Sequence, residues 1–430
     1  MRVGPVTWLL VATLVAVVTP AVLAAEKLVF WHGMSADLWE AVRPLVQEFG
    51  AKSGVQVEAS QVSWQGTRDR LLSRMAGGYG PDAIMLPSSG WEALTDFLVD
   101  LGPMLKSDRS FDLADFLPAS LWVWQAFGRQ YALPWSNDVA VFWYHPGLVA
   151  AAGLSAPGRD WDWSNWLQYA QKMTVDLDGD GRRDRYGWLE WFTHTFLTLV
   201  WANDADFFIG GQPSWHMPQV REALTFYADF YPPRKNVTLL WDELAHVGID
   251  PLQGVYPSAA FAQGRVAMLA AGTWFADTYV TQADGATAQW ALAQWPKSPK
   301  GKRATSLEGQ GLAVTATSRR PDSAYKYLKW LVGVKGQALV AEAGQIPVRA
   351  SVLTDGTFLR QWPSSARNQV VETCRYARPV ARDVNWPRLM GPNQPLRTAV
   401  YDFLHGRHSW EQARAKLDQS VLPLLPKVNR

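Results

Sequence analysis

The first 140 residues alternate between short apolar runs and amphipathic segments, and this alternation limits the possible folds more than any other feature of the sequence. Period-two or continuous apolar patterns predict strands, and apolar residues repeating on one helical face predict helices. Strands are expected over 27–31, 55–61 and 82–86, and helices over 36–50, 67–76 and 91–99. Such strand–helix–strand repeats favour an α/β fold with a mainly parallel sheet covered by helices on both faces.

The rest of the chain continues in a less regular form. Residues 131–144 form a long strand-like stretch, and 161–279 are rich in helical patterns and aromatic residues. Short strands are expected over 290–295 and 311–316, and a helix over 323–332. We find no internal repeat and no long Gly/Ser linker. Two α/β lobes joined by more than one crossing of the chain fit this order best.

Tryptophan is over-represented, with 24 among 430 residues. Its large flat apolar face and its one N–H donor suit ligands with flat apolar faces edged by hydroxyls, and sugars are the main class of such ligands. Core packing is the ordinary role of any single tryptophan. Many of these tryptophans nevertheless stand where loops or turns are expected, namely Trp31, Trp64, Trp91, Trp135, Trp188, Trp191 and Trp274. We therefore expect a carbohydrate ligand.

The N-terminus has the pattern of a secretory signal peptide. Arg2 precedes an apolar run over 8–18, Pro20 ends it, and a small-residue cleavage site follows near Ala24 or Ala25. The run is too short for a membrane-spanning helix with its own flanks. Because no cysteine stands at the cleavage point, no lipid anchor is expected there. The mature protein is expected to be free in the periplasm.

Composition excludes several other classes. Cys374 is the only cysteine, so an intramolecular disulfide and a cysteine-ligated metal cluster are impossible. The chain carries 41 basic and 39 acidic residues without a basic block, so nucleic acid is not an expected partner.

Six short motifs occur in a fixed order along the chain. They are 28–34 (LVFWHGM), 81–85 (PDAIM), 132–138 (ALPWSND) with 142–144 (FWY), 260–268 (AFAQGRVAM) with 272–274 (GTW), 309–314 (GQGLAV) and 344–349 (GQIPVR). In this order they resemble the carbohydrate-type family of extracellular solute-binding proteins that serve ABC importers. The resemblance covers nearly the whole mature chain.

The resemblance implies two lobes, each a mainly parallel sheet flanked by helices, with a ligand cleft between them at a hinge. After a signal peptide over 1–24, we expect the N-lobe over 25–137 and 291–320, and the C-lobe over 138–290 and 321–430. Binding proteins of this kind close on ligand by a hinge motion. The implied partners are a small-molecule carbohydrate and the membrane permease subunits of an ABC importer, and a monomer is expected.

The resemblance and the chemistry of the side chains together indicate a ligand site. Trp274, in the GTW motif, is the expected stacking residue, and Asp138 at the hinge can accept hydrogen bonds from two adjacent sugar hydroxyls. Arg378 and Arg382 match a family segment near the cleft and could hold hydroxyls or a phosphate. Because ligands bind beyond the carboxyl ends of parallel strands, residues after the first three strands are also included. The remaining candidates are His32, Trp64, Ser88, Ser89, Trp91, Asn137, Trp188, Trp191, Gly309 and Gly311, the two glycines for close backbone approach to the ligand.

Each of these assignments has a structural alternative. Trp274 could pack in the core, Asp138 could stabilise the hinge by a hydrogen bond, and Arg378 could form a surface salt bridge.

An Asp-rich segment has the spacing of a calcium loop. Its oxygen ligands would stand at positions one, three, five and nine, occupied by Asp176, Asp178, Asp180 and Asp184. Gly181 fits position six, but position twelve is Gly187 where a bidentate Glu is usual, and Glu190 is the candidate substitute. A solvated turn is the alternative. Bound calcium would be structural, and no other cofactor is expected.

Motifs of common enzyme families are missing: there is no Gly-x-Ser-x-Gly, no His-Glu-x-x-His and no phosphate loop. The chain is therefore expected to be a non-enzymatic receptor for a mono- or oligosaccharide. One alternative is a glycerophosphate or glycerophosphodiester receptor. Residues 30–34 also resemble the glycerophosphate-binding branch of the family, and Arg378 or Arg382 could bind a phosphate. Another is a secreted carbohydrate-active enzyme, whose two carboxylates need no fixed spacing. A third is a calcium-stabilised adhesion or scaffold module.

Overall fold

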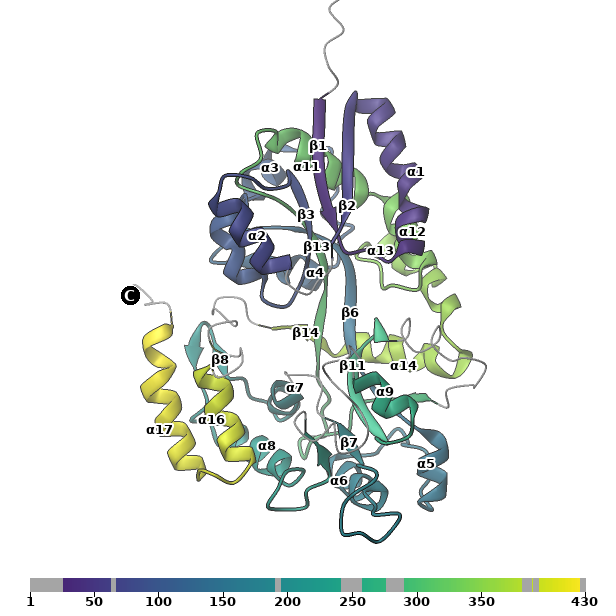
Figure 1. Cartoon of the computed structure of the whole chain (residues 1–430), viewed down its shortest axis with the longest axis vertical. Helices are drawn as coiled ribbons and strands as arrows, with labels where there is room; N and C mark the ends of the chain where they lie inside the picture. Colours follow the sequence, from purple (N-terminus) through teal and green to yellow (C-terminus); the bar gives the residue numbers. More distant parts are fainter. Residues whose placement is uncertain are drawn as a thin grey trace, which may run out of the picture.

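The computed structural model describes residues 26–62, 67–189, 195–240, 257–275, 290–380, 389 and 394–425. The molecule is elongated, with an upper and a lower lobe (Figure 1). Two long strands, β6 (Leu133–Tyr144) and β13 (Thr305–Val314), run through the junction between the lobes. We call them the crossing strands. Among the described residues, no helix is long and apolar enough to cross a membrane.

The upper lobe is built on parallel strands, as expected. Strand β1 (Glu26–His32) pairs in parallel with β2 (Val55–Gln61) and with β3 (Ala83–Pro87). Helix α1 (Ala36–Ser53) joins β1 to β2, and its first turn is capped by Ser35, whose Oγ accepts a hydrogen bond from the Leu38 backbone N–H. The predicted strands and connecting helices of this lobe are confirmed.

Smaller elements complete the upper lobe. They are α2 (Thr67–Ala76), the 3-10 helix η1 (Trp91–Phe97), α3 (Gly102–Ser107), α4 (Pro118–Trp122), β4 (Gln125–Ala126), β5 (Arg129–Gln130), α13 (Ala350–Leu353) and η4 (Thr357–Gln361). Strands β4 and β5 form a short antiparallel hairpin.

One mixed sheet extends through both lobes. Its order is β10-β7-β11-β6-β13-β3-β1-β2, with β12 also paired to β6 and β14 to β13. The strands of the lower lobe are β7 (Trp188–Leu189), β10 (Thr238–Leu239), β11 (Met268–Gly272), β12 (Ala291–Ala293) and β14 (Ala377–Pro379). Strand β6 is antiparallel to β11, β12 and β13. The sheet at the junction is therefore antiparallel, although parallel pairing dominates the upper lobe.

Helices of the lower lobe enclose an aromatic core. They are α5 (Pro146–Ala151), α6 (Trp163–Met173), α7 (Thr195–Ala202), α8 (Pro218–Ala228), α9 (Pro257–Ala262), α14 (Ser364–Arg375), α16 (Pro395–Leu404) and α17 (Trp410–Ser420), with the hairpin β8 (Phe208–Ile209) and β9 (Gln212–Pro213) and the 3-10 helix η5 (Leu422–Leu424). In the core, the rings of Trp166 and Trp188 lie 4.7 Å apart, and the Trp295 indole N–H donates to the Ala140 carbonyl at 2.8 Å.

Most tryptophans serve packing, which corrects the expected loop positions. Trp31 lies in β1, Trp135 in β6 and Trp188 in β7, and the last two are fully buried. Burial of such rings contributes a large apolar area, and a chain without disulfides depends on that area for stability. The excess of tryptophan therefore reflects the cores of the lobes more than a ligand site.

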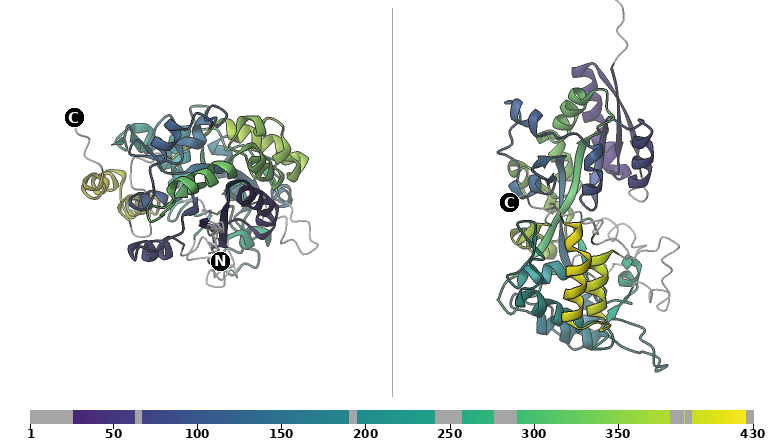
Figure 2. Two further views of the ribbon diagram at one scale, coloured as in Figure 1. Left: turned by 90° about the horizontal axis from the view of Figure 1, so that it is seen from above. Right: turned by 90° about the vertical axis from the view of Figure 1, so that its left-hand side faces the viewer.

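The expected lobe boundaries are wrong in the C-terminal part. Helices α11 (Pro321–Leu331) and α12 (Val334–Glu342) were expected in the C-lobe, but they pack on α1 in the upper lobe (Figures 1 and 2). The rings of Tyr327 and Phe49, for example, lie 5.2 Å apart. Strand β12, expected in the N-lobe, pairs with the lower part of β6. The amphipathic pattern of a helix shows that one face packs on a core, but it does not show whether that core belongs to the upper or the lower lobe.

Candidate functional site

The junction carries the two main predicted ligand residues, Asp138 and Trp274. After β11 ends at Gly272, the Thr273 backbone N–H donates to the Val139 carbonyl at 3.1 Å, and the Thr273 hydroxyl donates to Asp138 Oδ1 at 3.0 Å. Thr273 thereby places Trp274 next to Asp138. The Trp274 indole folds over Gly272, because a Cβ there would stand 2.2 Å from Trp274 Nε1. We name Asp138, Thr273 and Trp274 the β11 flank.

Exposure separates two tryptophans from the others. Among the described tryptophans, only Trp122 and Trp274 are well exposed, with 59% and 44% of their surface accessible. Both lie at the junction of the lobes, Trp122 at the end of α4 and Trp274 after β11. An exposed tryptophan face is costly in water, so two of them at one junction indicate contact with a ligand or a partner.

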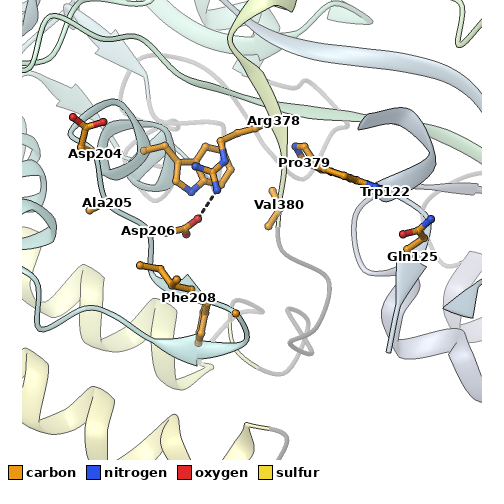
Figure 3. Close-up of a pocket in the computed structure, with 12 residues that line it drawn as sticks. Trp122, Gln125, Asp204, Ala205, Asp206, Phe208, Arg378, Pro379 and Val380 are labelled. Carbon is orange, nitrogen blue, oxygen red and sulfur yellow. Dashed lines mark hydrogen bonds and ion pairs between the residues drawn. The ribbon is translucent and has the colours of Figure 1, made fainter. Parts of the chain in front are cut away.

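A cavity of about 780 Å³ lies on the other side of the crossing strands. Its wall contains Trp122 and Gln125 from the upper lobe, Trp201, 204–206 and 208–210 from the lower lobe, and 378–380 at β14 (Figure 3). In the sheet, β14 pairs with β13 and β11 pairs with β6, so the pair β6–β13 separates this cavity from the β11 flank. We name it the β14 cavity.

Arg378 points into the β14 cavity and is already paired. Its guanidinium lies 4.8 Å from the centre of the Trp201 ring and 2.7 Å from Asp206 Oδ2 (Figure 3). The salt bridge considered as the alternative for Arg378 is therefore present. A phosphate at this guanidinium would compete with the Asp206 carboxylate.

Ser88, Asn137 and Gly309 form internal hydrogen bonds that tie β13 to the end of β3 and β6 to α4. The Ser88 backbone N–H donates to the Gly309 carbonyl at 2.8 Å, and the Gly309 N–H donates to Ser88 Oγ at 3.2 Å. The Asn137 amide Nδ2 donates to Ser120 Oγ at 2.8 Å. Ser88 and Asn137 are 2% and 3% exposed, so both act as internal ties in this structure.

Gly309 and Gly311 do not leave room for a ligand, contrary to our expectation. A Cβ on Gly309 would stand 2.0 Å from the Ser136 carbonyl oxygen, and one on Gly311 would stand 2.4 Å from the Trp124 ring. The space that these glycines leave open is occupied by β6 and by Trp124. Glycine is needed here for close strand packing.

Three other candidates are enclosed in cores. His32 stacks on Trp39 at 4.2 Å between ring centroids, and burial lowers its pKa to about 4, so its imidazole is neutral at neutral pH. The Trp91 indole N–H donates to the Val123 carbonyl at 3.1 Å. Trp91 and Trp188 have 1% and 0% exposed surface, so neither offers a face to a ligand in this structure. His32 and Trp91 were predicted from strand ends and Trp188 from its place after the Asp-rich loop, but all three side chains turn inward.

The remaining candidates divide into two groups. Ser89 is exposed beyond the end of β3. Trp64, Trp191 and Arg382 lie outside the described residues.

The Asp-rich loop between α6 and β7 brings three of its four aspartates together. Carboxylate oxygens of Asp176, Asp178 and Asp184 lie within 4.8 Å of one another. Asp180 is not in this group, and its Oδ1 accepts from the Arg182 backbone N–H at 2.7 Å. Hydrogen bonds from backbone N–H groups, chiefly that of Gly181, lower the pKa of Asp176. The spacing of the three carboxylates fits a hard cation.

Trp122, Trp201 and Asp206 were not anticipated from the sequence. Trp122 and Trp124 stand two residues apart on α4 and just after it, yet one is exposed and the other is 1% exposed. Nothing in their local spacing distinguishes them. The difference in exposure between Trp122 and Trp124 comes from the tertiary contact of α4 with the crossing strands.

Comparison with known proteins identifies the family. Residues 35–338 match the sequence model of the family described as bacterial extracellular solute-binding protein. The chain belongs to this family. The match covers more than half of the chain and both crossing strands.

This solute-binding protein has curated relatives of similar length. It is 24% identical over 360 residues to an erythritol/L-threitol-binding protein of Mycolicibacterium smegmatis, covering 75% of this chain and 70% of the relative. It is 25% identical over 335 residues to the diacetylchitobiose binding protein DasA of Streptomyces coelicolor, covering 75% and 73%. A shorter match, 33% identical over 155 residues, covers 34% of this chain and only 32% of an uncharacterized lipoprotein of Streptomyces antibioticus.

Solved structures confirm the two-lobed fold. An ABC substrate-binding protein from Listeria monocytogenes, in complex with cycloalternan, is 20% identical and superposes with a TM-score of 0.75. The superposition covers 93% of this chain and 99% of the other. The predicted α/β class and bilobal architecture are confirmed.

Proposed function

We propose that this solute-binding protein is the substrate-binding receptor of an ABC importer and captures a carbohydrate between its lobes. Membership of the family supports the receptor class. The ligands named for similar proteins, diacetylchitobiose, erythritol or L-threitol, and cycloalternan, support a polyhydroxylated solute. The observation that carries the proposal is the exposed Trp274 held beside Asp138 at the junction of the lobes.

The β11 flank has the two kinds of group that a sugar site needs. The Trp274 face can stack on the apolar face of a sugar ring. Asp138 can accept hydrogen bonds from adjacent hydroxyls, and charge-assisted bonds of this kind are the stronger ones. The Thr273 hydroxyl already bonds to Asp138, which fixes the carboxylate for such a role.

Ligand binding would change the balance between open and closed forms. A ligand shifts this balance only by its difference in affinity for the two forms. Contacts to the β11 flank and to the facing lobe together exist only when the lobes approach. The membrane permease would then recognise the closed form, and no covalent chemistry is involved. We infer an exported, monomeric, non-enzymatic protein whose signal peptide spans 1–24.

The glycerophosphate alternative loses part of its support. It relied on Arg378 or Arg382 as the phosphate ligand, and Arg378 is engaged by Asp206 and Trp201. A neutral polyhydroxylated ligand can bind without breaking the ion pair between Arg378 and Asp206.

Thermal unfolding tests the proposal directly. The mature protein would be melted with monosaccharides, disaccharides, oligosaccharides, sugar alcohols and glycerophosphates in turn, with tryptophan fluorescence recorded alongside. We expect a rise in Tm with one class of neutral carbohydrate, since a ligand at one hundred times its Kd contributes about 2.7 kcal/mol. A rise with glycerophosphates alone, or product formation from an oligosaccharide, would refute the proposal.

We also propose a structural calcium ion at Asp176, Asp178 and Asp184. Calcium is expected to raise Tm, and the variant Asp176→Asn should lose most of this gain because it removes a negative charge and a ligand oxygen. The measurement is a calcium titration of Tm after chelator treatment. Asp112→Asn, which removes an acid in the upper lobe away from this loop, is the charge-matched control. An equal calcium response in wild-type protein and Asp176→Asn would exclude this loop.

A further inference from the structure

A second cavity, of about 720 Å³, lies on the lower lobe and is rich in arginine. It is bounded by the loop 157–159, by Gln294 and Arg303, and by the last turns of α14. Three arginines line it, Arg159, Arg303 and Arg375, against a single acid, Glu372. We name it the arginine groove. None of its lining residues also lines the β14 cavity.

Arg303 is held rigidly at the base of the arginine groove. Its Nε donates to the Trp295 carbonyl, and its Nη2 donates to the Arg159 carbonyl. Both acceptors are neutral, and within the described parts of the chain no carboxylate forms an ion pair with Arg303. The nearby acid, Asp160, is bonded to Lys297 at 2.6 Å. Among the residues that the structure describes, this half-buried guanidinium therefore has no bonded counter-charge.

Burial is the main influence on the charge of Arg303 and lowers its pKa. Tyr376 and Asp160 act in the opposite direction, and the charge of Arg159 makes the smallest contribution, which lowers the pKa. Arg375 pairs with Glu372 at 2.8 Å on the outer edge of the groove, and both side chains are largely exposed. The groove is therefore lined by three guanidinium groups, and one of them, that of Arg303, is held in place by two backbone carbonyls.

Polar side chains next to Arg303 are also fixed. The Tyr376 hydroxyl donates to Gln294 Oε1 at 2.7 Å, and Gln294 Nε2 donates to Gln369 Oε1 at 2.6 Å. These bonds define a preorganised polar wall, which lowers the cost of ordering side chains around a solute.

We propose that the arginine groove binds a small solute that carries oxyanion groups, either carboxylates or phosphates. Guanidinium groups bind both kinds of oxyanion in bidentate geometry. The volume is within the usual range of small-molecule sites, roughly 300–1,000 Å³. Since α14 packs on β12 and on β6 in the lower lobe, the site is formed by one lobe and does not require closure. It is separate from the carbohydrate site proposed above.

Titration calorimetry with citrate and with inorganic phosphate, at constant ionic strength, tests this inference on the mature protein. We expect saturable binding of at least one of the two, and their relative affinities distinguish a carboxylate site from a phosphate site. Arg375→Gln should weaken binding by about tenfold, because it removes a charge-assisted contact. Glu372→Gln should tighten it by about threefold, because it removes the one acid of the groove and releases Arg375.

Two controls make the outcome decisive. Arg414→Gln removes an exposed arginine on α17, outside the groove, and should leave the affinity unchanged. Adding a carbohydrate that binds the protein should not displace the anion. Absence of saturable binding by either anion, or equal affinity in Arg375→Gln, Glu372→Gln and wild type, would overturn the inference without affecting the carbohydrate proposal.

Discussion

Replacing Trp274 with alanine is expected to weaken carbohydrate binding by about thirtyfold or more while leaving the fold intact. Loss of a tryptophan at the centre of a binding site typically costs about 2 kcal/mol or more. The fold should survive because Trp274 is 44% exposed, and its ring lies over Gly272 and edge-on to Phe275. The measurement is calorimetric affinity for the carbohydrate that raises Tm, with Tm of the free variant as the test of folding.

Trp122→Ala is the matched control for this prediction. Trp122 is the other exposed tryptophan at the junction, but it lines the β14 cavity across the crossing strands. We expect this variant to keep its affinity. Asp138→Asn, which keeps the shape and removes the charge, should show a milder loss than Trp274→Ala. If Trp122→Ala loses binding and Trp274→Ala keeps it, the carbohydrate site lies in the β14 cavity instead.

Gly309→Ala is expected to destabilise the protein by about 2–4 kcal/mol, which is the largest stability effect that we predict for a single methyl group. The φ angle of Gly309 is +153°, and an added Cβ would stand 2.0 Å from the Ser136 carbonyl oxygen. The atoms that the added Cβ would meet belong to the backbone of Ser136 and Asn137 in β6. The two crossing strands would therefore have to separate. Denaturant unfolding monitored by tryptophan fluorescence measures the loss.

The control for Gly309→Ala separates backbone strain from steric overlap. Gly128 also has a positive φ, +73°, but nothing lies within 4 Å of its added Cβ. Gly128→Ala should therefore cost only about 1 kcal/mol. Equal losses in the two variants would mean that strain alone, and not contact between β13 and β6, determines the requirement for glycine.

The sequence predicted the upper lobe well because its strands are short, buried and separated by regular helices. The run 27–31 and the run 82–86 became β1 and β3 with the expected parallel pairing. Helix α1 was predicted to end at Gly50, but it continues to Ser53 and is capped by Gly54 at φ 74°. In each of these elements, local pattern and tertiary environment agree.

Prediction was weaker wherever side-chain direction or lobe membership decides the outcome. Asp138 and Trp274 were placed together, but a residue at a strand end can face inward, as His32 does. Because bulky aromatic residues fill cores as readily as ligand sites, composition could not separate Trp188 from Trp274. The sequence predicted α11 as a helix. Its contacts with α1 join residues far apart in the chain, so the local sequence pattern does not predict them.

The pairing of β6 with β13 has a further consequence for how this protein unfolds. The ladder runs from Leu307 opposite Val139 to Leu312 opposite Leu133, and one hydrophobic cluster includes Ile84 of the upper lobe together with Leu269 of the lower lobe. Each lobe also has a hydrophobic cluster of its own, but melting either lobe would expose the apolar surface of this shared cluster. We therefore expect the two lobes to unfold as a single cooperative unit, although they are two bodies in shape.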